Sequence, residues 1–166
     1  MIEETQEDDE ASAMKMGINL KNLSLLLDAY RNARTYGTLI RCKWDKKITD
    51  KIEKELDGIK NTLIFMQFSD SIEHLQKLVR QTRVLQNQYD IVITNPPYLN
   101  CYDDALKTFI HKNYRDYSKD LFSTFIVRAL EFCKPGGYAG LMTPNVWMFL
   151  KSYKKLREFI LNHGSI

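Results

Sequence analysis

Residues 89–98, YDIVITNPPY, restrict the fold of this chain more than any other stretch. The unbroken apolar run Ile91-Val92-Ile93 is typical of a β-strand that is covered on both faces, as in the centre of a parallel sheet. Pro96 and Pro97 then remove two backbone donors, and each fixes its own φ angle at about −65°. A proline also holds the residue before it in extended geometry, so Asn95 and Pro96 are both extended. The chain therefore leaves its sheet here as a rigid segment.

Hydrophobic spacing predicts the elements around this strand. The predicted helices cover residues 19–34, 49–56, 71–87, 118–134 and 148–161. Residues 38–42 indicate a short strand or a connector, residues 99–117 a loop, and residues 138–143 a second buried strand. Ser118 is the expected N-cap of its helix, and Pro135-Gly136-Gly137 is expected to end that helix. Strand, crossover helix, strand and helix is the order of an open α/β sheet, so we predict an α/β fold with a mostly parallel sheet flanked by helices.

The net charge of +3 is unevenly distributed along the chain. Residues 1–10 contain six acids and no base, which leaves residues 11–166 with 24 bases against 15 acids. Residues 1–11 hold too little apolar surface to favour order, so we expect a disordered acidic tail there. The basic remainder suits a polyanionic partner, although a scattered basic surface explains it equally well. The bases of the last helix, Lys151, Lys154, Lys155 and Arg157, could contact phosphates or form a solvated face.

Several classes of protein are disfavoured. Cys42, Cys101 and Cys133 stand far apart without a CxxC pair, which argues against a disulfide framework and a zinc site. We expect no metal. No apolar run approaches the ~18 residues of a membrane span, and an acidic N-terminus is the opposite of a signal peptide's basic start. We therefore expect a cytoplasmic protein that does not enter a membrane.

The segment Asn95-Pro96-Pro97-Tyr98 suits the binding of an exocyclic NH2 group. Ligands of open α/β sheets bind beyond the carboxyl ends of the strands, where this segment lies. The Asn95 side-chain oxygen could accept one hydrogen of the NH2 group and the Pro96 carbonyl the other. That arrangement draws the nitrogen towards tetrahedral geometry and frees its lone pair for attack without a strong base. Tyr98 could supply a flat face on which a base stacks.

The motif and the residues that follow it resemble a known family. NPPY after an apolar strand is similar to the amino-group methyltransferases that use S-adenosylmethionine. Residues 119–161, KDLFSTFIVRALEFCKPGGYAGLMTPNVWMFLKSYKKLREFIL, resemble bacterial adenine-specific DNA methyltransferases, especially the large methylases of BREX phage defence and type IIG restriction-modification. The resemblance extends from about Leu23 to the C-terminus and is strongest from Tyr89 onward.

The resemblance implies a fold, a substrate and a set of site residues. It implies a partial Rossmann-like, class I methyltransferase fold over residues 12–166, and a substrate adenine flipped out of double-stranded DNA. Asn95, Pro96, Pro97 and Tyr98 would form the catalytic segment. The other residues expected to bind substrate or DNA are Tyr102, Tyr117, Trp147, Lys151 and Lys154, although the aromatic ones could instead serve packing. Proteins of a defence system and other parts of the same polypeptide are the expected partners.

Other functions remain open at this point. Glutamine N5-methylation of a protein poses the same chemical problem, and that family also carries NPPY. However, Leu99-Asn100-Cys101 does not look like its continuation. Guanine N2-methylation of RNA is a further alternative, although it favours a Phe at the end of the motif. A non-catalytic module could also have kept the segment for DNA binding or assembly alone.

The cofactor half of such an enzyme is not recognisable in the sequence. A glycine-rich loop after the first strand lets the backbone pack against the cofactor, yet no two of the seven glycines are separated by a single residue. The acid that binds the ribose hydroxyls is not recognisable either, so the cofactor-binding residues are unknown. We therefore expect the base-binding part of a longer enzyme whose N-terminal cofactor-binding strands are missing, or a degenerate paralogue.

Overall fold

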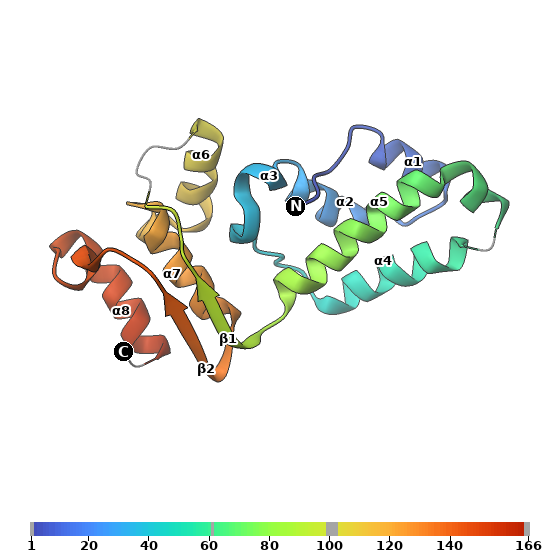
Figure 1. Cartoon of the computed structure of the whole chain (residues 1–166). Coiled ribbons are helices and arrows are strands. Elements are labelled where there is room, and N and C mark those ends of the chain that lie inside the picture. Colours follow the sequence, from blue (N-terminus) through green and yellow to red (C-terminus); the bar gives the residue numbers. More distant parts are fainter. Residues whose placement is uncertain (1, 61, 99–102, 165–166) are drawn as a thin grey trace. The chain divides into compact units, whose positions relative to one another are not determined.

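The chain divides into two compact units, Met1–Asn87 (unit 1) and Gln88–Ile166 (unit 2) (Figure 1). The computed structural model describes residues 2–60, 62–98 and 103–164. Within these ranges, no helix is both long enough and apolar enough to cross a membrane. The single methyltransferase domain expected over residues 12–166 stays a prediction.

Unit 1 is built from helices packed around apolar side chains. Its helices are α1 (Asp9–Lys15), α2 (Leu20–Tyr30), α3 (Ala33–Tyr36), the 3₁₀ turn η1 (Gly37–Leu39), α4 (Lys46–Ile59) and α5 (Leu63–Gln86). The predicted helices are confirmed, with α4 and α5 longer than expected, but the helix expected over residues 19–34 is divided into α2 and α3. The Asp45 carboxylate accepts a hydrogen bond from the Lys47 backbone N–H at 2.8 Å and so caps the start of α4. Residues 38–42 contain no strand, so the connector reading of this stretch holds.

The acidic N-terminal segment differs from the disordered tail expected for residues 1–11. The Thr5 backbone N–H donates to the Tyr30 carbonyl at 3.0 Å, and its hydroxyl donates to the Leu27 carbonyl at 2.6 Å. The Glu3 backbone N–H donates to Gln81 Oε1 at 2.9 Å, and α1 begins at Asp9. The composition rule fails here because it counts apolar surface and neglects hydrogen bonds to neighbouring helices.

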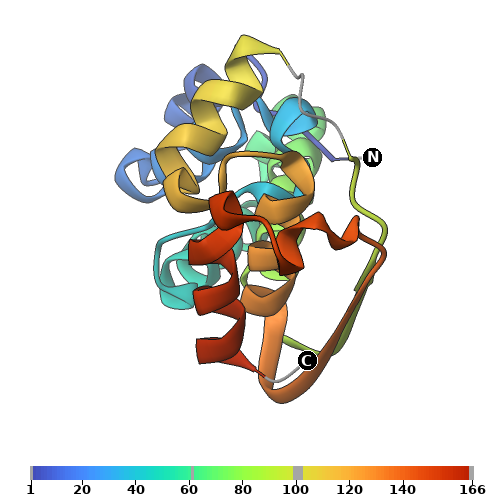
Figure 2. The ribbon, with the colours of Figure 1, turned by 90° about the vertical axis from the view of Figure 1, so that its left-hand side faces the viewer.

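Unit 2 contains a two-stranded parallel sheet, β1 (Tyr89–Thr94) and β2 (Cys133–Leu141). The other elements are α6 (Asp104–Asn113), η2 (Arg115–Tyr117), α7 (Leu121–Phe132), η3 (Asn145–Met148), η4 (Lys151–Tyr153) and α8 (Lys154–His163). Helix α7 connects the two strands, and α8 runs beside α7 (Figure 2). A mixed helix and strand fold with a parallel sheet agrees with the α/β prediction in this coarse form.

The two strands meet through an irregularity that the Pro-Gly-Gly sequence makes possible. Tyr89 pairs with Cys133 and Ile91 with Tyr138, so β2 carries the extra residues of a bulge. Gly136 has a φ of +79°, which favours glycine. Pro135, which has no N–H for the ladder, belongs in such a bulge. The expectation that Pro135-Gly136-Gly137 ends the helix is therefore wrong, because α7 ends at Phe132 and β2 begins at Cys133.

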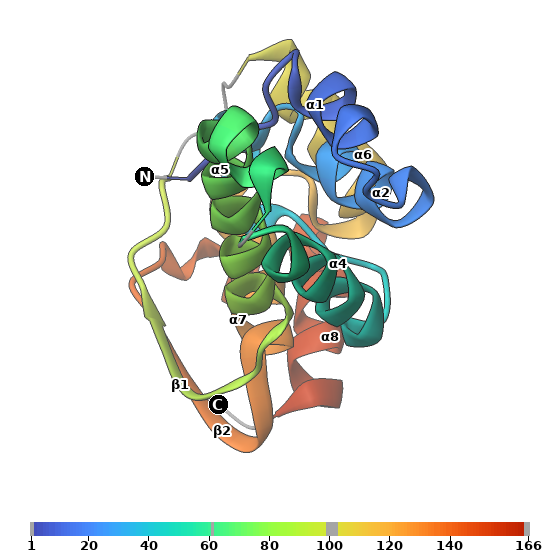
Figure 3. The same cartoon turned by 90° about the vertical axis from the view of Figure 1, so that its right-hand side faces the viewer.

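One face of this sheet is uncovered, which corrects the prediction of strands buried on both faces. Ile91 and Ile93 of β1 are 63% and 81% exposed, and Tyr138 of β2 is 75% exposed. Figure 3 shows α7 and α8 on the same side of the strands. The apolar run predicted the strand correctly, but the described residues of unit 2 cover it from that side alone.

Three further details differ from the predictions. Residues 104–113 of the expected loop form α6, because Asp103 accepts a hydrogen bond from the Leu106 backbone N–H at 2.7 Å and caps the helix. The expected cap Ser118 lies two residues before Asp120, the residue that precedes α7. The last helix starts at Lys154 instead of residue 148, since two short 3₁₀ turns precede it.

The glycines of β2 provide a matched test of the strand pairing. A Cβ at Gly137 would lie 2.9 Å from the Asp90 carbonyl oxygen, whereas one at Gly140 would meet only the Ile93 side chain at 3.8 Å. We predict that Gly137→Ala lowers the free energy of unfolding by about 1–3 kcal/mol. Gly140→Ala should change it by less than about 1 kcal/mol. Urea unfolding of both variants measures the difference, and equal losses would contradict the close approach at Gly137.

Candidate functional site

The segment Asn95–Tyr98 leaves the carboxyl end of β1 as the sequence predicts. The Met142 backbone N–H donates to the Thr94 carbonyl at 3.3 Å, so the two strands stay paired up to the start of this segment. Pro96 is buried, while Asn95 and Pro97 are exposed. The buried proline anchors the segment, and the Asn95 side chain is left accessible beside it.

The Tyr98 hydroxyl connects this segment to the end of β2. It lies 3.3 Å from Asn95 Oδ1 and 3.1 Å from the Met142 carbonyl oxygen, and it donates to both. A phenol has one hydrogen, which these two acceptors share. Asn95 Oδ1 keeps a second lone pair for a ligand, because an amide oxygen can accept two hydrogen bonds. Tyr98 therefore orients the Asn95 amide without exhausting its acceptor capacity.

A hollow lies at the carboxyl ends of the two strands. Its lining residues are Ile93, Thr94, Asn95, Gly140, Leu141 and Met142. The apolar side chains offer contact surface, and Asn95 offers a polar group at the border. A shallow, mostly apolar surface with one oriented amide suits a flat ring that carries a hydrogen-bond donor on its edge.

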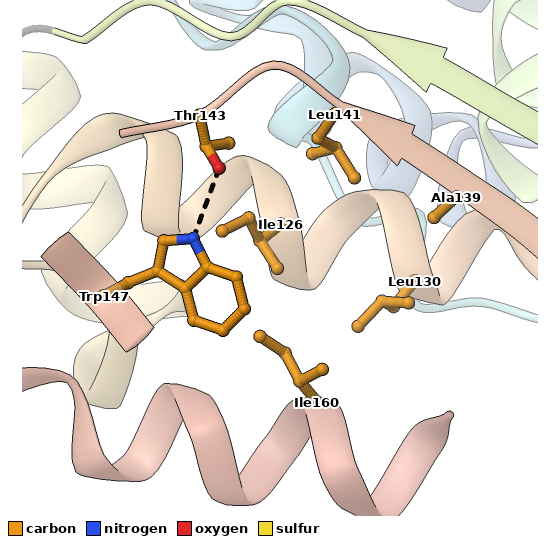
Figure 4. A pocket seen from close by; sticks show the side chains of 7 residues that line it. All are labelled: Ile126, Leu130, Ala139, Leu141, Thr143, Trp147 and Ile160. Atoms are coloured by element: carbon orange, nitrogen blue, oxygen red, sulfur yellow. Dashed lines mark hydrogen bonds between the residues drawn. The ribbon is translucent and has the colours of Figure 1, made fainter. Parts of the chain in front are cut away.

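Trp147 lies inside unit 2 and does not line this hollow. Its side chain is 8% exposed, and its indole N–H donates to Thr143 Oγ1 at 3.2 Å (Figure 4). It lines a cavity of about 220 Å³ together with Ile126, Leu130, Ala139, Leu141, Thr143 and Ile160. This surrounding is that of a packed side chain, and the expected role of Trp147 in binding substrate or DNA stays a prediction.

The other aromatic residues predicted to bind substrate give no common site. Tyr117 packs against the Phe159 ring with centroids 5.2 Å apart, and its carbonyl accepts a hydrogen bond from Thr124 Oγ1 at 3.1 Å. Tyr102 lies outside the described residues. Their roles in DNA binding stay predictions.

The basic side chains around α8 differ in whether they have an ion-pair or hydrogen-bond partner. Lys154 Nζ lies 3.6 Å from Glu158 Oε1, and Lys155 pairs with Asp116. Arg157 donates to the Trp147 carbonyl at 2.7 Å and to the Leu150 carbonyl at 2.8 Å, which holds the turn before α8. Lys151 is exposed and has no ion-pair partner in the described part of the chain.

The basic excess of the chain belongs to unit 2. Unit 2 contains ten Lys and Arg against seven Asp and Glu, whereas unit 1 contains 14 of each kind. The whole net charge of +3 is therefore on the unit that carries Asn95. A net positive charge on this unit favours a polyanionic ligand.

The residues at the hollow do not fit a complete site for S-adenosylmethionine. Such a site needs a backbone that approaches the cofactor closely at glycines and an acid for the ribose hydroxyls. The residues that line the hollow include one glycine and no acid. Separately, residues 2–60, 62–98 and 103–164 contain no group of three His, Cys, Asp or Glu side chains that could hold a metal ion.

Comparison with known proteins gives a consistent result. The model of the family described as Eco57I restriction-modification methylase matches residues 12–166. The chain is 34% identical over 149 residues to adenine-specific methyltransferase PglX of Lacticaseibacillus casei (strain Zhang), which covers 85% of this chain and 12% of PglX.

Two further relatives carry similar names. Adenine-specific methyltransferase BrxX of Escherichia coli O9:H4 (strain HS) is 28% identical over 147 residues, covering 86% of this chain and 12% of BrxX. Type II methyltransferase M.HincII of Haemophilus influenzae is 31% identical over 85 residues, covering 47% of this chain and 17% of that protein. The chain thus spans 12% of the length of the first two of these relatives.

Binding of the cofactor to the chain can be tested directly. We predict that S-adenosylmethionine binds weakly or not at all, because the hollow beside Asn95 has no acid and no glycine pair to hold it. Isothermal titration calorimetry of the folded chain measures this. Saturable binding with a micromolar Kd would contradict the prediction.

Proposed function

The chain belongs to the Eco57I restriction-modification methylase family, and from this membership we propose that it is the base-binding part of a DNA methyltransferase that modifies the N6 amino group of adenine. The family match confirms the resemblance noted in the sequence. The observation that carries the proposal is the exposed Asn95 amide, which the Tyr98 hydroxyl orients at the carboxyl end of β1. The names of the relatives PglX and BrxX support adenine as the base.

The proposed chemistry begins with hydrogen bonds that bind both hydrogens of an amino group. Asn95 Oδ1 would accept one N6 hydrogen of a flipped adenine, and the Pro96 carbonyl would accept the other. Both bonds strengthen as positive charge develops on the nitrogen, so they favour the transition state over the bound base. The Tyr98 ring would stack on the base, and the hollow above Gly140 would receive its edge.

The methyl donor of this family is expected to be S-adenosylmethionine, which supplies the methyl group. We assign its binding to parts of the protein beyond this chain, because the hollow lacks the groups that it needs. The sheet of unit 2 would then belong to a Rossmann-like methyltransferase fold over residues 12–166. A role in restriction-modification or phage defence completes the proposal.

The alternatives receive less support. Glutamine N5 and guanine N2 methylation would use the same acceptor pair, but two of the relatives are named adenine-specific. A non-catalytic module would bind a base without transferring a methyl group. An assay of methyl transfer distinguishes it from an enzyme.

Asn95 gives the direct test. We predict that the chain binds a duplex with adenine opposite an abasic position about tenfold more tightly than the same duplex with thymine there, the worth of one to two hydrogen bonds. Asn95→Ala should abolish this preference, and Asn162→Ala, at another exposed asparagine of unit 2, should keep it. Fluorescence anisotropy measures both.

A preference for adenine that survives Asn95→Ala would rule out the proposed grip. Methyl transfer by a polypeptide that includes this chain separates catalysis from docking. In the enzyme, Asn95→Ala should remove transfer and leave overall DNA binding largely intact. In a docking module, the variant should weaken binding, with no transfer to lose.

Tyr98 is predicted to act in two separable ways. Tyr98→Phe keeps the ring and removes the hydroxyl that orients Asn95, so adenine preference should fall about three- to tenfold, the worth of about one hydrogen bond. Tyr98→Ala also removes stacking, worth about 1–3 kcal/mol per base, and should weaken binding of the adenine duplex further. The same anisotropy assay compares them. Equal behaviour of the Phe variant and the unchanged chain would show that the hydroxyl does not position Asn95.

A further inference from the structure

A second cluster of polar groups lies where α7 and η4 begin. Lys119 Nζ donates to Ser152 Oγ at 2.7 Å and lies 4.7 Å from the centre of the Tyr153 ring. Tyr153 is 4% exposed and Lys119 is exposed, so the ammonium group lies over the buried ring while it stays accessible to solvent. Lys119 is thus a cation held in one place.

Tyr153 is itself held in place by Asp120 and Phe122. Its hydroxyl donates to the carboxylate of Asp120, which is 6% exposed, and its ring packs against Phe122 with centroids 5.7 Å apart. Burial, together with the Asp120 carboxylate, raises the pKa of Tyr153, so the hydroxyl keeps its proton. The support under Lys119 is therefore rigid, and little side-chain entropy remains to be lost when Lys119 binds an anion.

Chain topology puts this cluster at the same edge of the sheet as Asn95. Helix α7 ends at the amino end of β2 and has 12 residues, which span about 18 Å at about 1.5 Å per residue. The six residues of β1 span about 20 Å. Lys119, just before α7, therefore returns to the level of the carboxyl end of β1. Lys151 and Ser152 follow the carboxyl end of β2.

Lys119 and Lys151 also have no compensating carboxylate among the described residues. Neither has a carboxylate within ion-pair distance in the part of the chain that the structure describes, whereas Lys154 and Lys155 have Glu158 and Asp116. The Ser152 hydroxyl accepts from Lys119 and retains its own hydrogen for donation. The Lys119 ammonium group and the Ser152 hydroxyl, with Lys151 next to Ser152 in the chain, offer donors to the oxygens of a phosphodiester.

We propose that Lys119, Lys151 and Ser152 form a binding site for one phosphodiester group of the DNA backbone. This inference rests on the proposed function. The site would add a contact with DNA that does not depend on base sequence, at the edge of the sheet that carries Asn95. Phosphate contacts position a duplex without reading its sequence, so the site would set where a flipped base meets Asn95.

The salt dependence of DNA binding tests the site. Each phosphate neutralised contributes about 0.9 to the slope of log K against log salt concentration. The double variant Lys119→Met/Lys151→Met should lower that slope by about 0.9 and weaken binding roughly eightfold at 0.1 M salt, with adenine and thymine duplexes affected equally. Methionine removes the charge and keeps an unbranched apolar side chain, and Lys119→Arg with Lys151 intact should retain the full slope.

Lys134→Met is the matched control. It removes one positive charge from unit 2 at the opposite, amino end of the sheet, where Lys134 pairs with Asp90 at 2.9 Å. Its slope should equal that of the unchanged chain. An unchanged slope in the double variant, the same fall in Lys134→Met, or no duplex binding by the unchanged chain would each overturn the phosphate site.

Failure of the proposed function would look different. The adenine preference reports on Asn95, and the salt slope reports on the lysines. A chain without adenine preference whose slope still falls in the double variant would keep the phosphate site and lose the adenine proposal. A chain with adenine preference and an unchanged slope would show the reverse.

Discussion

The parallel pairing of β1 with β2 is the constraint on which the arrangement of unit 2 depends. Parallel strands need a crossover, and α7 supplies it, so the segments after both strands and the segment before α7 gather at one edge. Asn95, the Met142 carbonyl and Lys119 belong to these three segments, which are distant in sequence. Their place at a common edge is a property of the sheet and would be lost with the pairing.

The register of that pairing also controls the hydrogen bonding of the site. Besides Asn95 Oδ1, the Tyr98 hydroxyl donates to the backbone carbonyl of Met142, so its position depends on which residue of β2 pairs with Thr94. A slip by one residue would turn every side chain of β2 to the other face. The bulge at Pro135–Gly137 absorbs the extra residues before the regular ladder starts. Gly136 and Gly137, although far from Asn95 in sequence, thereby help to set the position of the Tyr98 hydroxyl.

Local signals in the sequence predicted those features that depend on local geometry. The apolar run of β1 and its two prolines located the strand and its end, and helical spacing located α2, α4, α5 and α7. Helix α6 was missed because its tyrosine- and aspartate-rich surroundings favour a loop, although the Asp103 cap was a readable signal. The start of β2 at Cys133 and the Tyr98–Met142 contact depend on residues more than 40 positions away. No local pattern encodes such contacts.

The uncovered face of the sheet has a consequence for how the chain is handled. Ile91, Ile93 and Tyr138 form a contiguous apolar surface, and the described residues add no third strand to either edge of the pair. Exposed strand edges and apolar patches are templates for pairing between molecules. Self-association should therefore rise with protein concentration and compete with ligands for the carboxyl edge. Affinities measured at different concentrations of this chain are comparable only after that competition is taken into account.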